Sequence, residues 1–300
     1  MKRIIDKLNK IDNLNVEEDV LLKNYTTFQV GGPADIFLTP KNENALLELI
    51  KVIQNINTPY FVLGEGSNVI VGDKGYRGII IYTGELDEVL VNENNIKAQS
   101  GATLKYITKK AQENSLAGME FASGIPGSLG GAVFMNAGAY GGEMNDIIVN
   151  VSAVNNKGKK VILDKEELEL SYRNSIFQEK NYIILDATME LNYGDKDQIK
   201  ERMDVLNQKR QNKQPLEYPS AGSSFKRPEN HYTGPLIEKA KMKGYQIGGA
   251  QVSEKHAGFI INKGDATAQD ILNLIKKIQK EVYEISGVKL KPEPKFLGKF

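Results

Sequence analysis

The feature that most constrains this chain is a glycine-rich stretch, Ala122–Glu143, which carries no charge before its last residue. Glycine costs conformational entropy on folding, so it is kept where the backbone needs a positive φ or must approach another group closely. The stretch holds seven of the 28 glycines in the chain, namely Gly124, Gly127, Gly130, Gly131, Gly138, Gly141 and Gly142. Its length and lack of charge favour a backbone that approaches a flat or phosphate-bearing ligand over a bare surface loop.

A second cluster of the same character, Leu63–Asn68, follows the short buried strand expected at Tyr60–Leu63. Successive backbone N–H groups in such a loop can form an anion-binding concavity. A dinucleotide fingerprint needs a third glycine and a following helix, but Val69 stands at the third-glycine position and another strand is expected after it. No GxxxxGK[ST] motif occurs, which excludes P-loop phosphoryl transfer. For this loop taken alone, an ordinary tight turn without a ligand is the simpler interpretation.

The bulk composition narrows the class of protein. With 300 residues, about two domains are expected, and the formal net charge of +1 gives no general attraction to nucleic acid or an anionic membrane. No apolar run approaches the roughly 20 residues of a membrane span, and the charged N-terminal sequence lacks the apolar core of a signal peptide. Cysteine is absent and the only histidines are His231 and His256, which excludes disulfides, thiolate catalysis and a His-rich metal site. We therefore expect a cytoplasmic protein without a metal, membrane or nucleic-acid partner, whose chemistry comes from other side chains or a cofactor.

Strands and helices mix along the chain without a regular βαβ rhythm, which favours the α+β class over a doubly wound sheet. Apolar spacing predicts an N-terminal helix over 1–20 and a β-hairpin within 149–163. A polar helix over 196–212 is expected to link two units. Thr267, followed three residues later by Asp270, predicts a capping box at the start of the last helix.

Three residues outside the glycine-rich segments could carry chemistry. Arg173 and Glu293 are charged residues in apolar or proline-stiffened surroundings, and Ser223 lies in a loop of small residues. Taken singly, each of the two charges is more often a structural ion pair or a solvated side chain. A Ser–His–acid hydrolase would have to use one of the two histidines, and no histidine motif accompanies Ser223. Lys213 and Arg227 could hold a phosphorylated substrate or simply lie on the surface.

Seven sequence blocks in a fixed order carry a resemblance to a known family and cover nearly the whole chain, from Asn24 to Gly298. The blocks are NYTTF with GGPA (24–34), LGEGSN (63–68), GIPGSLGGA (124–132), NAGAYG (136–141), YRNSIF (172–177), AGS with FK (221–226) and PEPKFLG (292–298). The chain resembles the UDP-N-acetylenolpyruvoylglucosamine reductases, with Pro294 where that family usually has an aliphatic residue.

The resemblance implies an architecture. After the N-terminal helix expected over 1–20, it predicts an α+β fold with a two-part FAD-binding domain of the vanillyl-alcohol-oxidase/PCMH type over 21–195 and an α+β substrate-binding domain over 196–300. The compact span 218–258 is similar to the shorter type of the family, which lacks an insertion that closes a tyrosine over the site. We expect the protein to be a monomer.

The implied activity is that of an NADPH- and FAD-dependent oxidoreductase, a UDP-N-acetylmuramate dehydrogenase of peptidoglycan (cell wall) synthesis. Such an enzyme reduces UDP-N-acetylglucosamine enolpyruvate, with hydride passing from the flavin to the vinyl carbon while an enolate develops beside it. By resemblance, Arg173 and Glu293 stabilise the enolate, which requires a protonated Glu293. By the same resemblance Ser223, rather than its neighbour Ser224, donates the proton.

The resemblance also assigns binding residues. FAD, bound without a covalent link, would be held by Gly64, Gly66, Ser67, Asn68, Gly124, Gly127, Ser128, Gly130 and Gly131. The UDP-sugar substrate would contact Tyr172, Lys213 and Arg227. Two alternatives stay open: another FAD-dependent oxidoreductase of the same superfamily that acts on an alcohol or sugar, and a flavin- or nucleotide-binding regulatory protein without turnover.

Overall fold

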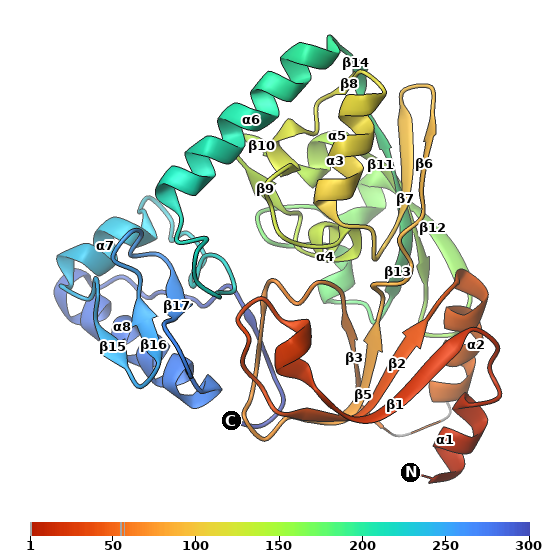
Figure 1. Ribbon diagram of the computed structural model, residues 1–300, viewed down its shortest axis with the longest axis horizontal. Coiled ribbons are helices and arrows are strands. Elements are labelled where there is room, and N and C mark those ends of the chain that lie inside the picture. The colour runs from red at the N-terminus through yellow and green to blue at the C-terminus, as the bar shows by residue number, and fades with distance from the viewer. Residues whose placement is uncertain (1, 55, 57) are drawn as a thin grey trace. The chain divides into compact units, whose positions relative to one another are not determined.

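A five-stranded sheet has the strand order β12-β11-β13-β7-β6, with every neighbouring pair antiparallel (Figure 1). In the computed structural model, which describes residues 2–54, 56 and 58–300, its strands are β6 (Val89–Asn92), β7 (Asn95–Gln99), β11 (Ile148–Val154), β12 (Lys160–Asp164) and β13 (Ile183–Glu190). Successive side chains of a strand point to opposite faces. Ile96 and Ala98 of β7 therefore lie on the same face, where both are fully buried in an apolar core.

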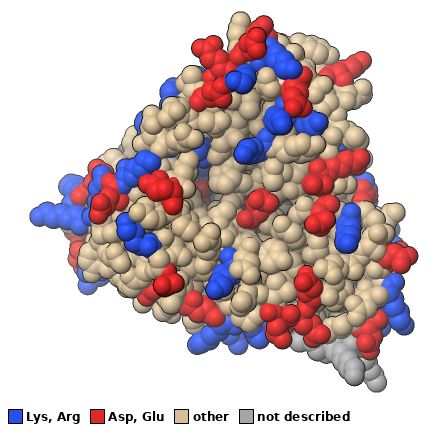
Figure 2. Space-filling model, viewed as in Figure 1, with Lys and Arg blue, Asp and Glu red and all other residues tan. Residues whose placement is uncertain are grey.

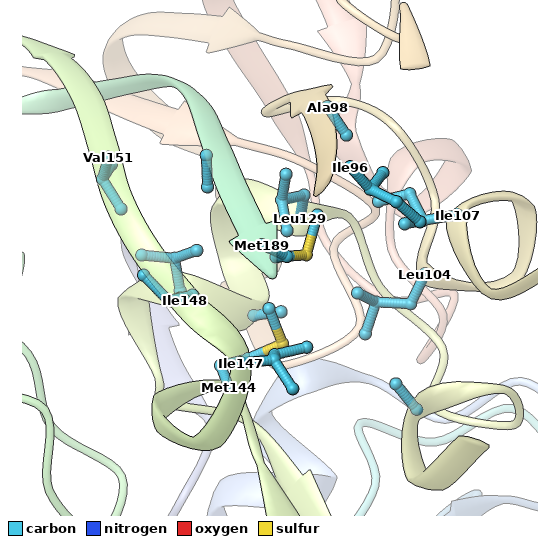
Figure 3. Close-up of a cluster of buried hydrophobic side chains, with 14 of the residues drawn as sticks. Ile96, Ala98, Leu104, Ile107, Leu129, Met144, Ile147, Ile148, Val151 and Met189 are labelled. Carbon is cyan, nitrogen blue, oxygen red and sulfur yellow. The ribbon is translucent and has the colours of Figure 1, made fainter. Parts of the chain in front are cut away.

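Three helices contribute to the core on that face of the sheet, namely α3 (Leu104–Glu113), α4 (Leu129–Phe134) and α5 (Met144–Ile147). The buried side chains that come together there include Leu104, Ile107, Leu129, Met144 and Met189 (Figure 3). Because α4 follows directly on Gly127 and Ser128, this core fixes the position of the glycine-rich segment.

A second sheet has the order β1-β2-β5-β3, in which β3 and β5 run parallel. Its strands are β1 (Leu14–Leu21), β2 (Pro33–Pro40), β3 (Tyr60–Leu63) and β5 (Tyr76–Tyr82). A separate apolar core joins residues of this sheet to the helices α1 (Lys2–Leu8) and α2 (Glu43–Ile53). Asn42 begins α2, since its side-chain oxygen accepts a hydrogen bond from the N–H of Ala45.

The chain divides into two units, and its path crosses between them repeatedly. Unit 1 comprises 1–18, 36–65 and 78–209, and unit 2 comprises 19–35, 66–77 and 210–300. The division falls inside β1, β2, β5 and the polar helix α6 (Lys196–Lys213). Unit 1 also holds two short antiparallel pairs, β8 (Leu116–Ala117) with β14 (Asn192–Tyr193), and β9 (Gly138–Ala139) with β10 (Gly142–Glu143).

Unit 2 is built around one long helix, α8 (Ala268–Ser286), whose apolar stripe is buried. The stripe consists of Ile271, Leu274, Ile275, Ile278 and Val282. Other elements of the unit include α7 (Thr233–Lys239), the antiparallel sheet β15 (Gln246–Ile247), β16 (Ala250–Val252) and β17 (Ile260–Asn262), and the parallel pair β4 (Val69–Val71) with β18 (Lys295–Leu297).

Two separate caps satisfy the first N–H groups of α8. Thr267 and Asp270 form the predicted capping box, with each side chain accepting from the other's backbone N–H at 3.0 Å. The carboxylate of Asp73 accepts the N–H groups of Ala268 at 2.8 Å and Gln269 at 3.0 Å, one on each oxygen. Burial raises the pKa of Asp270, but the hydrogen bonds from Thr267 and Gly249 outweigh that effect and lower it overall.

The prediction of a helix over 1–20 is wrong beyond Leu8. Helix α1 ends at that residue, and strand β1 begins at Leu14. Asn13 has a φ of 61°, a left-handed conformation that separates the two elements. Leu14 and Val16 are partly buried while Asn15 between them is exposed, and this period of two is that of a strand.

Other expectations about the fold are confirmed. The class is α+β, the hairpin within 149–163 is β11–β12 with Val154 opposite Lys160, and the polar helix is α6.

The stretch Ala122–Glu143 is not one loop, because it contains α4 and the β9–β10 pair. The last segment of unit 2 begins at Arg210, whereas the predicted substrate domain begins at 196. Unit 2 also includes residues 19–35 and 66–77, which the prediction placed mostly in the FAD-binding domain.

Basic and acidic side chains are interspersed on the face drawn in Figure 2, which agrees with a net charge of +1. None of the described helices has the length and apolar character needed to cross a membrane.

The Asp73 cap generates a stability prediction. We expect Asp73→Ala to lower the free energy of unfolding by about 1–2 kcal/mol, because two helix N–H groups lose their acceptor. Asp73→Asn keeps one acceptor oxygen and should lose about half as much. Urea unfolding followed by circular dichroism measures both. Equal losses in the two variants would contradict the two-oxygen cap.

Candidate active site

In unit 1 the segment Gly127–Leu129 is fastened to the segment that precedes α3. Leu104 N–H donates to the carbonyl of Gly127 at 3.0 Å, and Leu129 N–H donates to the carbonyl of Ala102 at 2.8 Å. Thr103 and Ser128 form an isolated bridge between these hydrogen bonds. The backbone of the glycine-rich segment is therefore held in place by the protein itself.

Gly64 brings the two predicted cofactor segments into contact within unit 1. A Cβ atom on Gly64 would collide with the hydroxyl oxygen of Ser128, so no other residue fits without movement. Gly130 is also tightly packed, because a Cβ atom there would lie 3.0 Å from the Cβ of Ser100. Several glycines thus serve packing between protein segments. At Gly131 the nearest atom to an added Cβ is the Ser128 hydroxyl at 3.7 Å, an ordinary contact.

Polar groups around these segments have capacity for a ligand. The hydroxyl of Ser100 is buried and has no hydrogen-bond partner in the described part of the chain, and Gly130 N–H donates to the carbonyl of the same residue. Ser128, which begins α4, makes no capping hydrogen bond with its side chain. Between residues 64 and 68, the described hydrogen bonds include none from Glu65, Gly66 or Ser67 N–H to a main-chain carbonyl. Within unit 1, the hydroxyls of Ser100 and Ser128 therefore suit a phosphate-bearing ligand.

Arg173 lies in unit 1 on a tight turn. Ser171 and Asn174 exchange backbone hydrogen bonds of 3.2 and 3.0 Å, and Arg173 between them has a φ of 54°. Its carbonyl accepts a hydrogen bond of 2.9 Å from the side chain of Gln178, and its guanidinium lies 5.2 Å from the ring centroid of Tyr172. A non-glycine residue in this conformation stores of order 1 kcal/mol of strain.

Helix α4 connects that turn to the glycine-rich segment. Its last residue, Phe134, offers a carbonyl that accepts from the hydroxyl of Ser175 at 2.8 Å and from the side chain of Gln178 at 3.0 Å. Asn136 just beyond the helix donates to the carbonyl of Ser171 at 3.2 Å. One short helix therefore fixes both the predicted cofactor segment at its start and the Arg173 turn at its end.

In unit 2, the segment of Ser223 lies beside the segment that ends in Glu293. Glu293 N–H donates to the carbonyl of Ser224 at 3.1 Å, and Phe225 forms a bridge with Pro292. On the other side, Ser223 forms a bridge with Phe259. The structure thus brings together two of the three predicted catalytic residues within this unit.

The two neighbouring serines have different surroundings. The Ser224 hydroxyl is buried and accepts the N–H of Ile260 at 2.8 Å. The Ser223 side chain is exposed, and Gly222 before it has a φ of 71°. Ser224 therefore has a structural role, and Ser223 is the serine whose hydroxyl faces outward.

Asn68 lies at the same edge of unit 2 as Glu293. Strands β4 and β18 are parallel, with Val69 opposite Lys295, and Lys295 N–H donates to the carbonyl of Asn68 at 2.9 Å. Glu293 and Asn68 therefore both lie just before the paired strands. Gly66 in the same loop has a φ of 60°, and a Cβ there would collide with the carbonyl oxygen of Tyr25.

His256 is a residue whose structural role the sequence did not indicate. Its Nδ1 accepts the N–H of Gly258 at 3.0 Å, and its ring meets that of Phe259 edge-on at 5.0 Å. Burial lowers its pKa, so the neutral form that can accept this hydrogen bond is favoured. No described hydrogen bond joins His256 to Ser223, so the hydrolase interpretation gains no support. Three or more His, Asp or Glu side chains positioned around a metal ion do not occur among the described residues.

The predicted substrate contacts lie in both units. Tyr172 is in unit 1 beside Arg173, whereas Lys213, at the end of α6, and Arg227 are in unit 2. The guanidinium of Arg227 lies 4.0 Å from the ring centroid of Tyr232.

Two family models match separate parts of this chain. A family model for an FAD binding domain matches residues 34–164, and a model for the C-terminal domain of UDP-N-acetylenolpyruvoylglucosamine reductase matches residues 214–297. The chain is 49% identical to a UDP-N-acetylenolpyruvoylglucosamine reductase from Clostridium novyi, over 96% of this chain and 94% of the relative. It is 49% identical to one from Caldanaerobacter subterraneus, over 98% of both chains.

A solved structure gives the same result for the fold. The crystal structure of UDP-N-acetylenolpyruvylglucosamine reductase from Thermus caldophilus has a TM-score of 0.81 to this chain at 34% sequence identity. The match covers 95% of this chain and 99% of the other.

The contrast between the two serines predicts a difference in stability. We expect Ser224→Ala to lower the free energy of unfolding by about 1–3 kcal/mol, because the buried Ile260 N–H is left without an acceptor. Ser223→Ala should change it by less than about 0.5 kcal/mol. Urea unfolding of the two variants makes the comparison, and a larger loss for Ser223→Ala would reverse the assignment.

Proposed function

The chain belongs to the UDP-N-acetylenolpyruvoylglucosamine reductase family, and we propose that Arg173, Ser223 and Glu293 carry the chemistry of its reaction. The protein reduces UDP-N-acetylglucosamine enolpyruvate to UDP-N-acetylmuramate in cell wall synthesis, with FAD as cofactor and NADPH as hydride donor. Because the matches cover nearly the whole chain, they favour this reaction over that of another FAD-dependent oxidoreductase or a binding protein without turnover.

FAD, when bound, takes hydride from NADPH and supplies it to the vinyl carbon of the substrate. We assign its binding to Gly64, Gly66, Ser67, Asn68, Gly124, Gly127, Ser128, Gly130 and Gly131. The contact between Gly64 and Ser128 and the unpartnered hydroxyl of Ser100 support this assignment in unit 1. We further propose that 21–195 serves FAD binding and 196–300 substrate binding, which the matched ranges 34–164 and 214–297 support.

Arg173 is assigned to the negative charge that develops on the substrate. As hydride reaches the vinyl carbon, charge grows on the adjacent carbon and its carboxylate, and a fixed guanidinium stabilises it electrostatically. The positive φ of Arg173 supports this role, because strained residues persist where the surrounding structure holds them for function. Gln178 supplies part of that hold through its hydrogen bond to the Arg173 carbonyl.

Glu293 and Ser223 are assigned to proton handling on the substrate. The observation that carries this assignment is the environment of Ser223, whose hydroxyl faces outward while the Ser224 carbonyl accepts the N–H of Glu293. Ser223 donates a proton to the enolate carbon, and a protonated Glu293 donates a hydrogen bond to the enolate. Because a serine hydroxyl is a weak acid, ordered water must return its proton after each turnover.

Tyr172, Lys213 and Arg227 are assigned to the UDP-sugar, the two basic residues to its diphosphate. A guanidinium and an ammonium both suit phosphate oxygens, the guanidinium through a bidentate fork. The cytoplasmic location and the monomeric state stay predictions from the sequence.

Stopped-flow kinetics test the role of Ser223. In Ser223→Ala we expect flavin reduction by NADPH to keep its rate, whereas reoxidation by the enolpyruvyl substrate slows by about 10²–10⁴-fold, because only the second half-reaction needs the proton. Ser224→Ala is the matched control and should keep both rates in the fraction that is folded. If Ser224→Ala alone slowed reoxidation, the proton donor would be the other serine.

A pH–rate profile tests the role of Glu293. Since the acid acts while protonated, activity of the natural enzyme should fall as pH rises and that carboxyl loses its proton. Glu293→Gln cannot titrate, so this alkaline loss should disappear while the maximal rate drops by about 10²-fold. A profile that keeps the same shape in the variant would rule out Glu293 as the titrating acid.

A further inference from the structure

In unit 2 the guanidinium of Arg227 is stacked on an aromatic ring. Its central carbon lies 4.0 Å from the ring centroid of Tyr232, well inside the roughly 6 Å over which a cation is attracted to a ring face. The Nε–H of Arg227 also donates to the carbonyl of His231 at 3.4 Å. The Tyr232 side chain is 64% exposed, so burial of apolar surface does not account for the position of the ring.

The backbone is fixed on both sides of this pair, by a hydrogen bond before it and by a buried helix face after it. Before Arg227, the N–H of Lys226 donates to the carbonyl of Lys291 at 2.9 Å. After Tyr232, helix α7 buries Leu236 and Ile237 in the core of the unit.

The link between the two anchors is a short turn. His231 N–H donates to the carbonyl of Pro228 at 3.2 Å, and Asn230 inside the turn has a left-handed φ of 58°. Asparagine accepts that conformation more readily than most residues. The ring and the guanidinium are thus brought together by two anchored segments and a defined turn.

We propose that Tyr232 is a positioning residue, which holds the Arg227 guanidinium in one orientation for the diphosphate of the nucleotide substrate. This inference rests on the proposed assignment of Arg227 to that diphosphate. An arginine side chain has many rotamers, and binding loses affinity when it must select one of them. The ring restricts the side chain before the ligand arrives. Stacking occupies the flat face of the guanidinium, whereas phosphate oxygens are bound at its N–H edge.

Titration calorimetry with UDP as the probe tests the proposal on the FAD-loaded enzyme. Tyr232→Leu removes the ring but keeps apolar bulk, and we expect UDP binding to weaken about two- to fivefold. Tyr232→Phe keeps the ring and should restore affinity to within about twofold of the natural enzyme. In steady-state assays the KM for the enolpyruvyl substrate should rise in Tyr232→Leu while kcat is unchanged, a split that general damage to the fold would not give.

Tyr283→Leu is the matched control. Tyr283 is another exposed tyrosine of unit 2 beside a cation, with Lys289 at 5.8 Å from its ring, and it lies on α8 rather than on the Arg227 turn. Its loss should leave UDP affinity unchanged. Weaker UDP binding in this variant would mean that removal of an exposed tyrosine is enough by itself, and would overturn the inference.

A double-mutant cycle with Arg227→Ala separates the inference from the assignment beneath it. In the Arg227→Ala background, Tyr232→Leu should weaken UDP binding no further, because the ring then has no guanidinium to hold. If Arg227→Ala itself leaves UDP affinity unchanged, the assignment of Arg227 to the diphosphate fails. If Arg227→Ala weakens binding but Tyr232→Leu does not, only the positioning role fails. Equal losses from Tyr232→Leu in both backgrounds would show that the ring contacts the nucleotide itself, which overturns positioning.

Discussion

The hydrogen bond from the N–H of Ile260 to the hydroxyl of Ser224 fixes the segment of unit 2 that carries the proposed catalytic residue Ser223. Ser224 lies in a bend, with its side chain buried like that of the following Phe225, whereas Ser223 before it is exposed. The same backbone also accepts the N–H of Glu293, and the bridge to Phe259 holds its other side. A buried polar group is costly unless it is paired, which makes this arrangement hard to invert. The identity of the outward serine therefore follows from the packing of its neighbour.

Unit 1 uses a comparable device in α4. The start of the helix continues the glycine-rich backbone. The carbonyl at its end, that of Phe134, accepts hydrogen bonds from Ser175 and Gln178, which both follow Arg173 closely in the sequence. Short helices contribute little stability by themselves, so α4 depends on its burial against the sheet. What it provides is a fixed spacing between a predicted cofactor segment and a strained arginine, which is how a rigid scaffold positions reactive groups on loops.

Local patterns allowed much of this to be predicted, and non-local contacts account for what was missed. The capping box at Thr267 is contained in four residues and was predictable, whereas the second cap of α8 comes from Asp73, far away in the sequence. The prediction of one helix over 1–20 was wrong because the apolar spacing of the first residues was extended past Asn13. The structure has a turn at Asn13 and a strand after it, where partly buried and exposed residues alternate at the start. The choice of Ser223 rested on its match to the family, and its physical reason, the pairing of Ser224 with Ile260, depends on a partner that no local pattern indicates.

The glycines illustrate how far composition alone can be trusted. The density of glycine between Ala122 and Glu143 suggested close approach of a ligand, yet a Cβ at Gly142 would collide with the ring of Phe121, and one at Gly130 would lie tightly against Ser100. A Cβ at Gly64 would collide with the side chain of Ser128. These contacts do not weaken the case for a cofactor. A phosphate can be held by backbone N–H groups only if the loops that carry them are packed tightly enough to keep those groups in place. In the proposed FAD site, the close contact between Gly64 and Ser128 holds two of the assigned segments together and so fixes the backbone around them.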